Sequence, residues 1–181
     1  MQKPVLAVAA FALAMVFTVG LAAQKTTHIH PGQGGSPHDR TEWTIDGANI
    51  SIEYGRPFLN GRKLGRVIAP YKREWRTGAD EATTLKTDKP LKFGTLAVPA
   101  GTYTLYTIPD EKEWVLAISR NVGQWGIPVQ QDKDVGRVKM GVAPTSASVE
   151  QLTISIDDTP AGGTLRIEWG PASASVPFTV G

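Results

Sequence analysis

The sequence predicts an all-β protein, an antiparallel β-sandwich of jelly-roll-like type with about eight to ten short strands and one long basic loop. Three observations indicate it. Apolar and polar residues alternate in many short segments, turn residues separate those segments, and no run of ten or more residues after the N-terminal stretch has a helical period. A closed β-barrel is the alternative, because its strands alternate in the same way. One domain is expected over residues 41–181, since no internal repeat is found.

The first 23 residues have the features of a signal peptide. Lys3 precedes a long apolar run, and the small residues Ala22 and Ala23 provide a cleavage position before Gln24. We therefore expect export to the periplasm or secretion, with membrane attachment only through an uncleaved signal segment. The chain has no cysteine, so its stability must come from burial of apolar side chains.

Residues 24–40, "QKTTHIHPGQGGSPHDR", predict a flexible polar tail, because they are rich in Gly and Pro and lack a period. All three histidines of the chain lie here. On an extended segment His28 and His30 would face the same way and could share a metal ion. His38 could add a third ligand only if the glycine-rich linker folded back. Since the composition favours disorder, we predict no metal site and no cofactor.

Five later segments alternate with a period of two. Their apolar faces comprise Ile50, Ile52 and Tyr54; Trp114, Leu116 and Ile118; Leu152, Ile154 and Ile156; Leu165, Ile167 and Trp169; and Val176, Phe178 and Val180. One apolar face per strand is typical of antiparallel sheets. The segment 101–109, "GTYTLYTIP", is apolar or aromatic on both faces and predicts a central strand covered on both sides.

Residues 55–78 show no strand alternation and predict a long connection. Such loops in compact domains are usually functional or disordered; the apolar residues of this one predict that it is ordered over one end of the fold. It carries one acid, Glu74, among seven basic residues: Arg56, Arg62, Lys63, Arg66, Lys72, Arg73 and Arg76. A basic loop rich in arginine attracts phosphate, carboxylate or acidic glycan groups. The net charge of the whole chain, +2, argues against nucleic acid as a partner.

Four motifs occur in one order: "YGRPFLNGRKLG", "WRTGADEATT", "VPAGTYTLYTIP" and "QWG". In these the chain resembles the exported bacterial family catalogued as domain of unknown function 2911, from about Ser36 to Val180. Family members typically have Tyr-Ser-Arg-Pro where this chain has Tyr-Gly-Arg-Pro at 54–57. They have Gly-Ala-Asn-Glu-Ala-Thr where this chain has Asp80 in place of the Asn, a change that adds a charge. The resemblance implies an exported domain and brings no reaction, substrate or catalytic residue.

No catalytic residue is predicted from motifs. The chain has no nucleophile elbow, His-Glu-x-x-His pair, phosphate-binding loop or dinucleotide fingerprint. A Ser-His-Asp triad could use only His28, His30 or His38, and of these His38 alone lies near the first expected strand. A carboxylate-dependent hydrolase acting on glycans is an alternative, with Asp80 or Glu81 paired to Glu53 or Glu74 across a cleft.

We expect a non-catalytic site for a polar or anionic small molecule or glycan of the cell envelope. The candidate site residues are Arg56, Arg62, Trp75, Arg76, Asp80, Glu81, Gln124 and Trp125. Trp75 and Trp125 are possible ligand platforms, whereas Trp114 and Trp169 fall in phase with buried residues. Arg76 is expected to pair with Asp80 or Glu81 across the intervening turn. A third possibility is a structural or assembly module that contacts another envelope protein.

Overall fold

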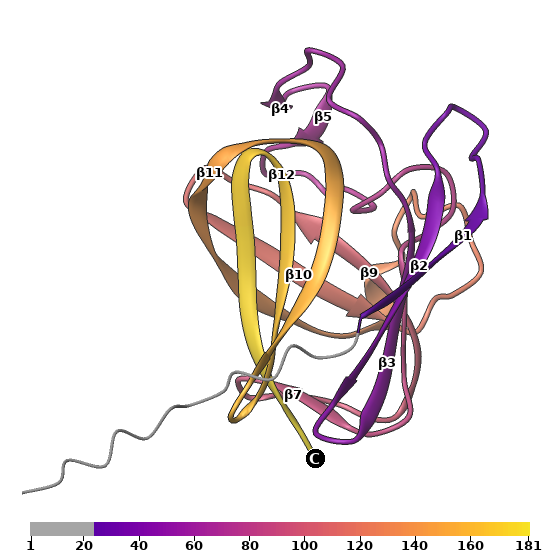
Figure 1. Ribbon diagram of the computed structural model, residues 1–181, viewed down its shortest axis with the longest axis vertical. Coiled ribbons are helices and arrows are strands. Elements are labelled where there is room, and N and C mark those ends of the chain that lie inside the picture. The colour runs from indigo at the N-terminus through magenta and orange to yellow at the C-terminus, as the bar shows by residue number, and fades with distance from the viewer. Residues whose placement is uncertain (1–23) are drawn as a thin grey trace, which may run out of the picture.

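The computed structural model describes residues 24–181, and the predicted signal peptide lies outside these residues (Figure 1). The described chain is all-β, apart from one short 3₁₀ helix, η1 (Gln131–Lys133). Its strands are β1 (Lys25–His30), β2 (His38–Ile45), β3 (Ala48–Gly55), β4 (Leu64–Gly65), β5 (Ile68–Pro70), β6 (Thr84–Thr87), β7 (Leu91–Phe93), β8 (Leu96–Val98), β9 (Gly101–Ile108), β10 (Glu113–Ser119), β11 (Asp134–Thr159) and β12 (Gly162–Val180). Over residues 24–181, no helix is long and apolar enough to cross a membrane.

Ten strands form one antiparallel sheet in the order β1-β2-β3-β6-β9-β10-β11-β12-β7-β8, and β4 and β5 form a separate parallel pair. The large sheet is open, with β1 and β8 at its edges. The prediction of an antiparallel all-β fold is confirmed, and the closed barrel is wrong. The jelly-roll-like sandwich stays a prediction, because the hydrogen bonds join ten strands in one sheet instead of dividing them between two.

The predicted apolar faces are buried in β3, β10, β11 and β12, apart from Val180, which is half-buried. Strand β9 is buried on both faces through most of its length, as expected of a central strand. Two segments that the alternation predicts as separate strands, 164–170 and 175–180, are parts of the continuous strand β12. Strands β11 and β12 pair along most of their length and form a long curved ribbon (Figure 1).

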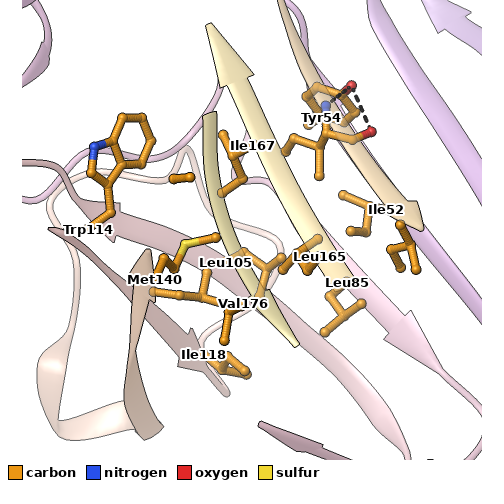
Figure 2. Close-up of a cluster of buried hydrophobic side chains, with 14 of the residues drawn as sticks. Ile52, Tyr54, Leu85, Leu105, Trp114, Ile118, Met140, Leu165, Ile167 and Val176 are labelled. Atoms are coloured by element: carbon orange, nitrogen blue, oxygen red, sulfur yellow. Dashed lines mark hydrogen bonds between the residues drawn. The ribbon is translucent and has the colours of Figure 1, made fainter. Parts of the chain in front are cut away.

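The sheet curls around one apolar core, to which β2, β3, β6, β9, β10, β11 and β12 all contribute (Figure 2). A hydrogen bond crosses this core from one part of the sheet to another: the amide of Ile154 on β11 donates to the hydroxyl of Tyr54 on β3, at 2.7 Å. The two residues are 100 positions apart in the chain. The core therefore holds strands from both halves of the chain against each other.

Half of the segment predicted as a flexible tail is strand. Residues Lys25–His30 form β1, which pairs with β2 across a glycine-rich turn. The prediction is wrong here because the polar residues of an exposed edge strand have the composition of a linker. The register shifts between His28 and His30, which is a β-bulge. His28 contacts Asp39 and His30 stacks on His38, so the bulge turns the two histidines to opposite faces of β1.

The long connection at residues 55–78 is ordered, as predicted, and packs over one end of the sheet, at the top of Figure 1. Isolated bridges join Phe58 to Gln151 and Trp75 to Thr107. Leu59, Ile68 and Ala69 are buried in the core cluster. The connection contains the parallel pair β4 and β5, and it brings Arg62 and Arg76 beside the turn that precedes β6.

Candidate functional site

The turn at residues 76–83 is rigid. Thr77 and Asp80 both have left-handed backbone conformations, with φ of 57° each. The hydroxyl of Thr77 lies 2.9 Å from that of Thr107, and the hydroxyl of Thr83 donates to the Thr77 carbonyl at 2.9 Å. These buried hydrogen bonds fix the turn to β9 and hold the Asp80 side chain toward the β1–β2 turn, where it accepts from the Gln33 amide at 3.0 Å.

Arg76 locks this turn, but not through the predicted ion pair. Its Nη1 donates to the backbone carbonyl of Asp80 at 2.9 Å and to that of Trp125 at 3.3 Å. Neither Asp80 nor Glu81 forms a salt bridge with Arg76 among the residues that the structure describes. The left-handed conformation of Asp80 explains the difference, because it turns the carbonyl toward the arginine and the carboxylate away from it.

A pocket of about 480 Å³ opens beside the turn. Four predicted site residues line it: Arg62, Trp75, Arg76 and Asp80. Apolar residues of the long connection form much of the remaining wall: Pro57, Phe58, Val67, Ile68 and Pro70. Glu74 and three residues of the β1–β2 turn, Gly34, Gly35 and Ser36, also line it. The pocket thus combines aromatic and aliphatic surface with charges of both signs.

Trp75 is a core residue at the bottom of this arrangement, not an exposed platform. Only 9% of it is accessible. Its ring stacks on Trp169, with centroids 5.6 Å apart and planes 10° from parallel, and meets Trp114 edge-on at 6.0 Å. Trp125, by contrast, is 44% exposed and lies beside the pocket, where its carbonyl receives the bond from Arg76.

The remaining predicted site residues lie outside the pocket lining. Arg56 is held in a closed arrangement: it pairs with Asp39 at 2.8 Å and donates to the Leu152 carbonyl and the Thr153 hydroxyl. Gln124 is half-buried, and its backbone carbonyl accepts from the Ala82 amide at 3.1 Å. Both residues therefore support the strands and turns around the pocket.

Glu74 on the pocket wall belongs to a hydrogen-bonded network. Gln131 donates to its carboxylate, and Arg137 lies 4.0 Å from it. Arg137 also bonds Asp134 at 2.9 Å and the Tyr106 hydroxyl at 2.7 Å. Burial, the hydrogen bond to Asp134 and its negative charge together raise the pKa of Tyr106. Tyr106 is therefore a neutral hydrogen-bond donor that holds Asp134 in this network.

The surface around the pocket is basic and partly apolar. Five exposed basic residues of the long connection form no ion pair within residues 24–181: Arg62, Lys63, Arg66, Lys72 and Arg73. Val67 and Ile127, which line the pocket, are large apolar side chains left exposed.

A second hollow, of about 620 Å³, lies over the outer face of β2, β3 and β6. Two of its charged residues form an ion pair, Arg40 with Glu53 at 2.6 Å, and the Asp88 carboxylate accepts from the Asn49 side chain at 2.6 Å. It contains none of the eight candidate binding residues, but it includes Glu53, one of the carboxylates considered for the hydrolase. Among the described residues, it also lacks the exposed apolar residues that flank the first pocket.

A histidine and carboxylate cluster lies behind Asp80. Nε2 of His38 is 3.2 Å from Oε2 of Glu81 and 3.6 Å from Oδ2 of Asp80. The ring of His30 stacks on that of His38 with centroids 4.2 Å apart, and its Nε2 is 3.8 Å from the Glu81 carboxylate. Sequence reasoning missed this cluster because it treated the glycine-rich turn as disordered. The spacing of the three histidines was the signal that could have revealed it.

These features define an all-β domain with a mixed apolar and charged pocket, and a histidine–carboxylate cluster, at one end of an open sheet. The chain belongs to the family described as protein of unknown function DUF2911, whose model matches residues 36–178 and confirms the resemblance seen in the motifs. Comparisons with curated proteins and with solved structures found no match. The match includes His38, Asp80 and Glu81, whereas β1 with His30 precedes it.

Proposed function

We propose that this chain is an exported, non-catalytic binding domain for an acidic glycan-type ligand of the cell envelope. The observation that carries the proposal is the pocket that gathers Arg62, Arg76 and Asp80 beside the aromatic residues Trp75 and Phe58. Sugars present apolar faces that lie against aromatic rings and hydroxyls that bond to polar side chains. Carboxylate groups on the sugar would add attraction to the basic surface of the long connection.

The apolar rim supports a ligand larger than one sugar. Ile127 and Val67 are exposed at the pocket, and Trp125 stands beside it. A ligand that filled the pocket and continued across Trp125 would cover all three. The exposed residues Lys72 and Arg73 of the same connection would then be free to meet further acidic groups.

Titration of the full chain with a uronic-acid hexasaccharide, followed by tryptophan fluorescence, tests the proposal. Trp75 lines the pocket and Trp125 is exposed beside it, so a change in emission on binding reports on these two of the five tryptophans. We expect saturable binding that weakens several-fold between low and physiological salt. Cellohexaose, which lacks the carboxylates, should bind much more weakly.

Matched variants locate the ligand. Trp125→Ala and Arg62→Gln should each weaken binding of the acidic hexasaccharide by about tenfold, which corresponds to about 1.4 kcal/mol. Val122→Ala is the control, since Val122 is an exposed apolar residue of the same loop that does not line the pocket. This ligand class would be rejected if the wild type showed no saturable binding, or if Trp125→Ala and Arg62→Gln bound the hexasaccharide as tightly as Val122→Ala.

A hydrolase is the second candidate, because the carboxylates of Glu74 and Asp80 both line the pocket. Two carboxylates across a sugar-sized cleft are the machinery of most glycosidases. Release of reducing sugar from the acidic hexasaccharide by the wild type, lost in both Glu74→Gln and Asp80→Asn, would establish hydrolysis in place of binding alone. Retained affinity without sugar release would favour the binding domain.

A further inference from the structure

Two buried polar atoms of the histidine–carboxylate cluster have no hydrogen-bond partner within residues 24–181: Nε2 of His38 and Oε2 of Glu81. His38 is 2% exposed. The two atoms lie 3.2 Å apart, yet they do not meet the geometry of a hydrogen bond to each other. Buried polar atoms almost always have a hydrogen-bond partner. Two neighbouring atoms that lack one therefore indicate a further group that both of them contact.

The separations between the surrounding atoms are close to those between the ligands of one metal ion. In a tetrahedral site with bonds of about 2.0–2.1 Å, neighbouring ligand atoms are about 3.3 Å apart. The measured separations are 3.2 Å for His38 to Glu81, 3.6 Å for His38 to Asp80 and 3.8 Å for His30 to Glu81. The ligand atoms of His30, His38 and Glu81 all lie within 4.8 Å of one another.

The backbone positions these groups independently of any ion. A side chain at Gly55 would lie 2.6 Å from Nε2 of His38, so glycine leaves the room in which the imidazole sits. The Gln33 amide donates to Oδ2 of Asp80 at 3.0 Å and fixes that carboxylate at the edge of the cluster. Supporting contacts of this kind are what orient the ligands of metal sites.

We propose that His30, His38 and Glu81 bind a divalent transition-metal ion of the zinc class, with Asp80 as the adjoining carboxylate. Two imidazoles and carboxylate oxygen suit Zn²⁺ better than Ca²⁺ or Mg²⁺, which prefer oxygen ligands alone. The inference goes beyond the proposed glycan binding and does not depend on it. Asp80 connects the two sites, because it lines the pocket and lies 3.6 Å from His38.

His30 must turn for both histidines to coordinate. A ligating imidazole holds the metal near the plane of its ring, and two stacked rings 18° from parallel do not share such a point. Nδ1 of His30 accepts a hydrogen bond from the Gly32 amide at 3.1 Å, so neutral His30 carries its proton on Nε2. Coordination through Nε2 breaks that bond and moves the proton to Nδ1. The side chain of His30 is 38% exposed, which gives it room to rotate.

Calorimetric titration of the full chain with ZnCl₂, without a histidine tag and after removal of chelators, tests the proposal. We expect one Zn²⁺ per chain. His30→Ala and Glu81→Gln should each weaken Zn²⁺ binding by more than the roughly 10–100-fold that loss of an outer-shell partner costs. Both side chains are partly exposed, so these variants should remain folded, which circular dichroism checks. In the wild type, Zn²⁺ should also shift the amide resonance of Gly32.

His28→Ala is the matched control. His28 lies on the same strand but bonds Asp39 at 3.1 Å, outside the cluster. Its removal should leave Zn²⁺ affinity and the Gly32 shift unchanged. The proposal is overturned if the wild type does not bind Zn²⁺, if either His30→Ala or Glu81→Gln binds it as tightly as the wild type, or if only His28→Ala loses it. Glycan binding plays no part in this titration, so its failure and that of the proposed function are distinguishable.

Discussion

Arg56 shows how a residue predicted to bind a ligand can instead hold the fold together. Its guanidinium reaches β2 through Asp39 and β11 through Leu152 and Thr153. Burial alone would raise the pKa of Asp39, but hydrogen bonds from Arg56 and His28 and the charge of Arg56 outweigh it, and the pKa of this carboxyl is lowered. Asp39 is therefore ionised in the native protein over a wider range of pH than in the unfolded chain.

Arg56→Gln should lower the free energy of unfolding by about 1–3 kcal/mol at pH 7, because it leaves the Asp39 carboxylate with one partner fewer. A lowered native pKa gives stability that is present above the unfolded pKa, near 4, and is lost as the pH falls through the native value. Urea midpoints at pH 7 and pH 3 should therefore differ less in the variant than in the wild type.

Arg40→Gln is the control for this prediction. Arg40 also pairs with a carboxylate, that of Glu53 at 2.6 Å, but on the exposed face of β2 and β3. An exposed pair contributes about 0–1 kcal/mol, so its loss should change the midpoints little. Equal losses in the two variants would contradict the role assigned to Arg56.

At the scale of the element, strands such as β3 and β10 could be predicted from the sequence, whereas β1 could not. Alternation of buried apolar residues predicts strands such as β3 and β10, because a buried face imposes the period. Five of the six residues of β1 are polar, and the sixth, Ile29, is exposed, so no burial pattern distinguishes the strand from a linker. The bulge adds a second difficulty. It turns His28 and His30 to opposite faces, whereas regular alternation predicts the same face.

Gly55, at the end of β3, is predicted to be required for the packing of β2 against the 76–83 turn. A methyl group there would clash with the Ala79 carbonyl and with Nε2 of His38. Gly55→Ala should cost about 1–3 kcal/mol, measured by chemical denaturation, and should weaken Zn²⁺ binding.

Gly141→Ala provides the comparison, because nothing lies within 4 Å of an added methyl group at that position of β11. Alanine also narrows the unfolded ensemble relative to glycine, so this variant should be as stable as the wild type or slightly more stable. A Gly55→Ala variant with unchanged stability would show that β2 and the turn can move apart without penalty.

At the scale of the molecule, the sequence predicts the fold class but not how the strands join. Local alternation says which face of a strand is buried and nothing about its partners, which are set by long-range contacts. The segments 164–170 and 175–180 therefore look like two strands, yet they are one. The pocket could be predicted only in part for the same reason. The sequence places Trp75, Arg76 and Asp80 close together, whereas Ile127 and Trp169 meet them only in the folded chain.

The hydrogen bond from Ile154 to Tyr54 should contribute to the stability of the whole molecule, because it joins β3 to β11 through the core (Figure 2). Tyr54→Phe keeps the ring and leaves the buried amide of Ile154 without this partner, at a cost of about 1–3 kcal/mol. Urea denaturation measures the loss. Tyr71→Phe removes a hydroxyl from a half-buried ring of the long connection and should cost less than half as much.

Strand β1 lies at the edge of the sheet and hydrogen-bonds to β2 alone. Edge strands open locally at a lower free energy than the strands inside a sheet. His38 lies on the inner strand β2 and Glu81 in the 76–83 turn, whereas His30 lies on this edge strand. Detachment of β1 would thus withdraw one ligand and leave the rest of the domain folded. The lifetime of a bound ion would then depend on how fast one hairpin opens, and variants of β1 could change the exchange rate with little change in global stability.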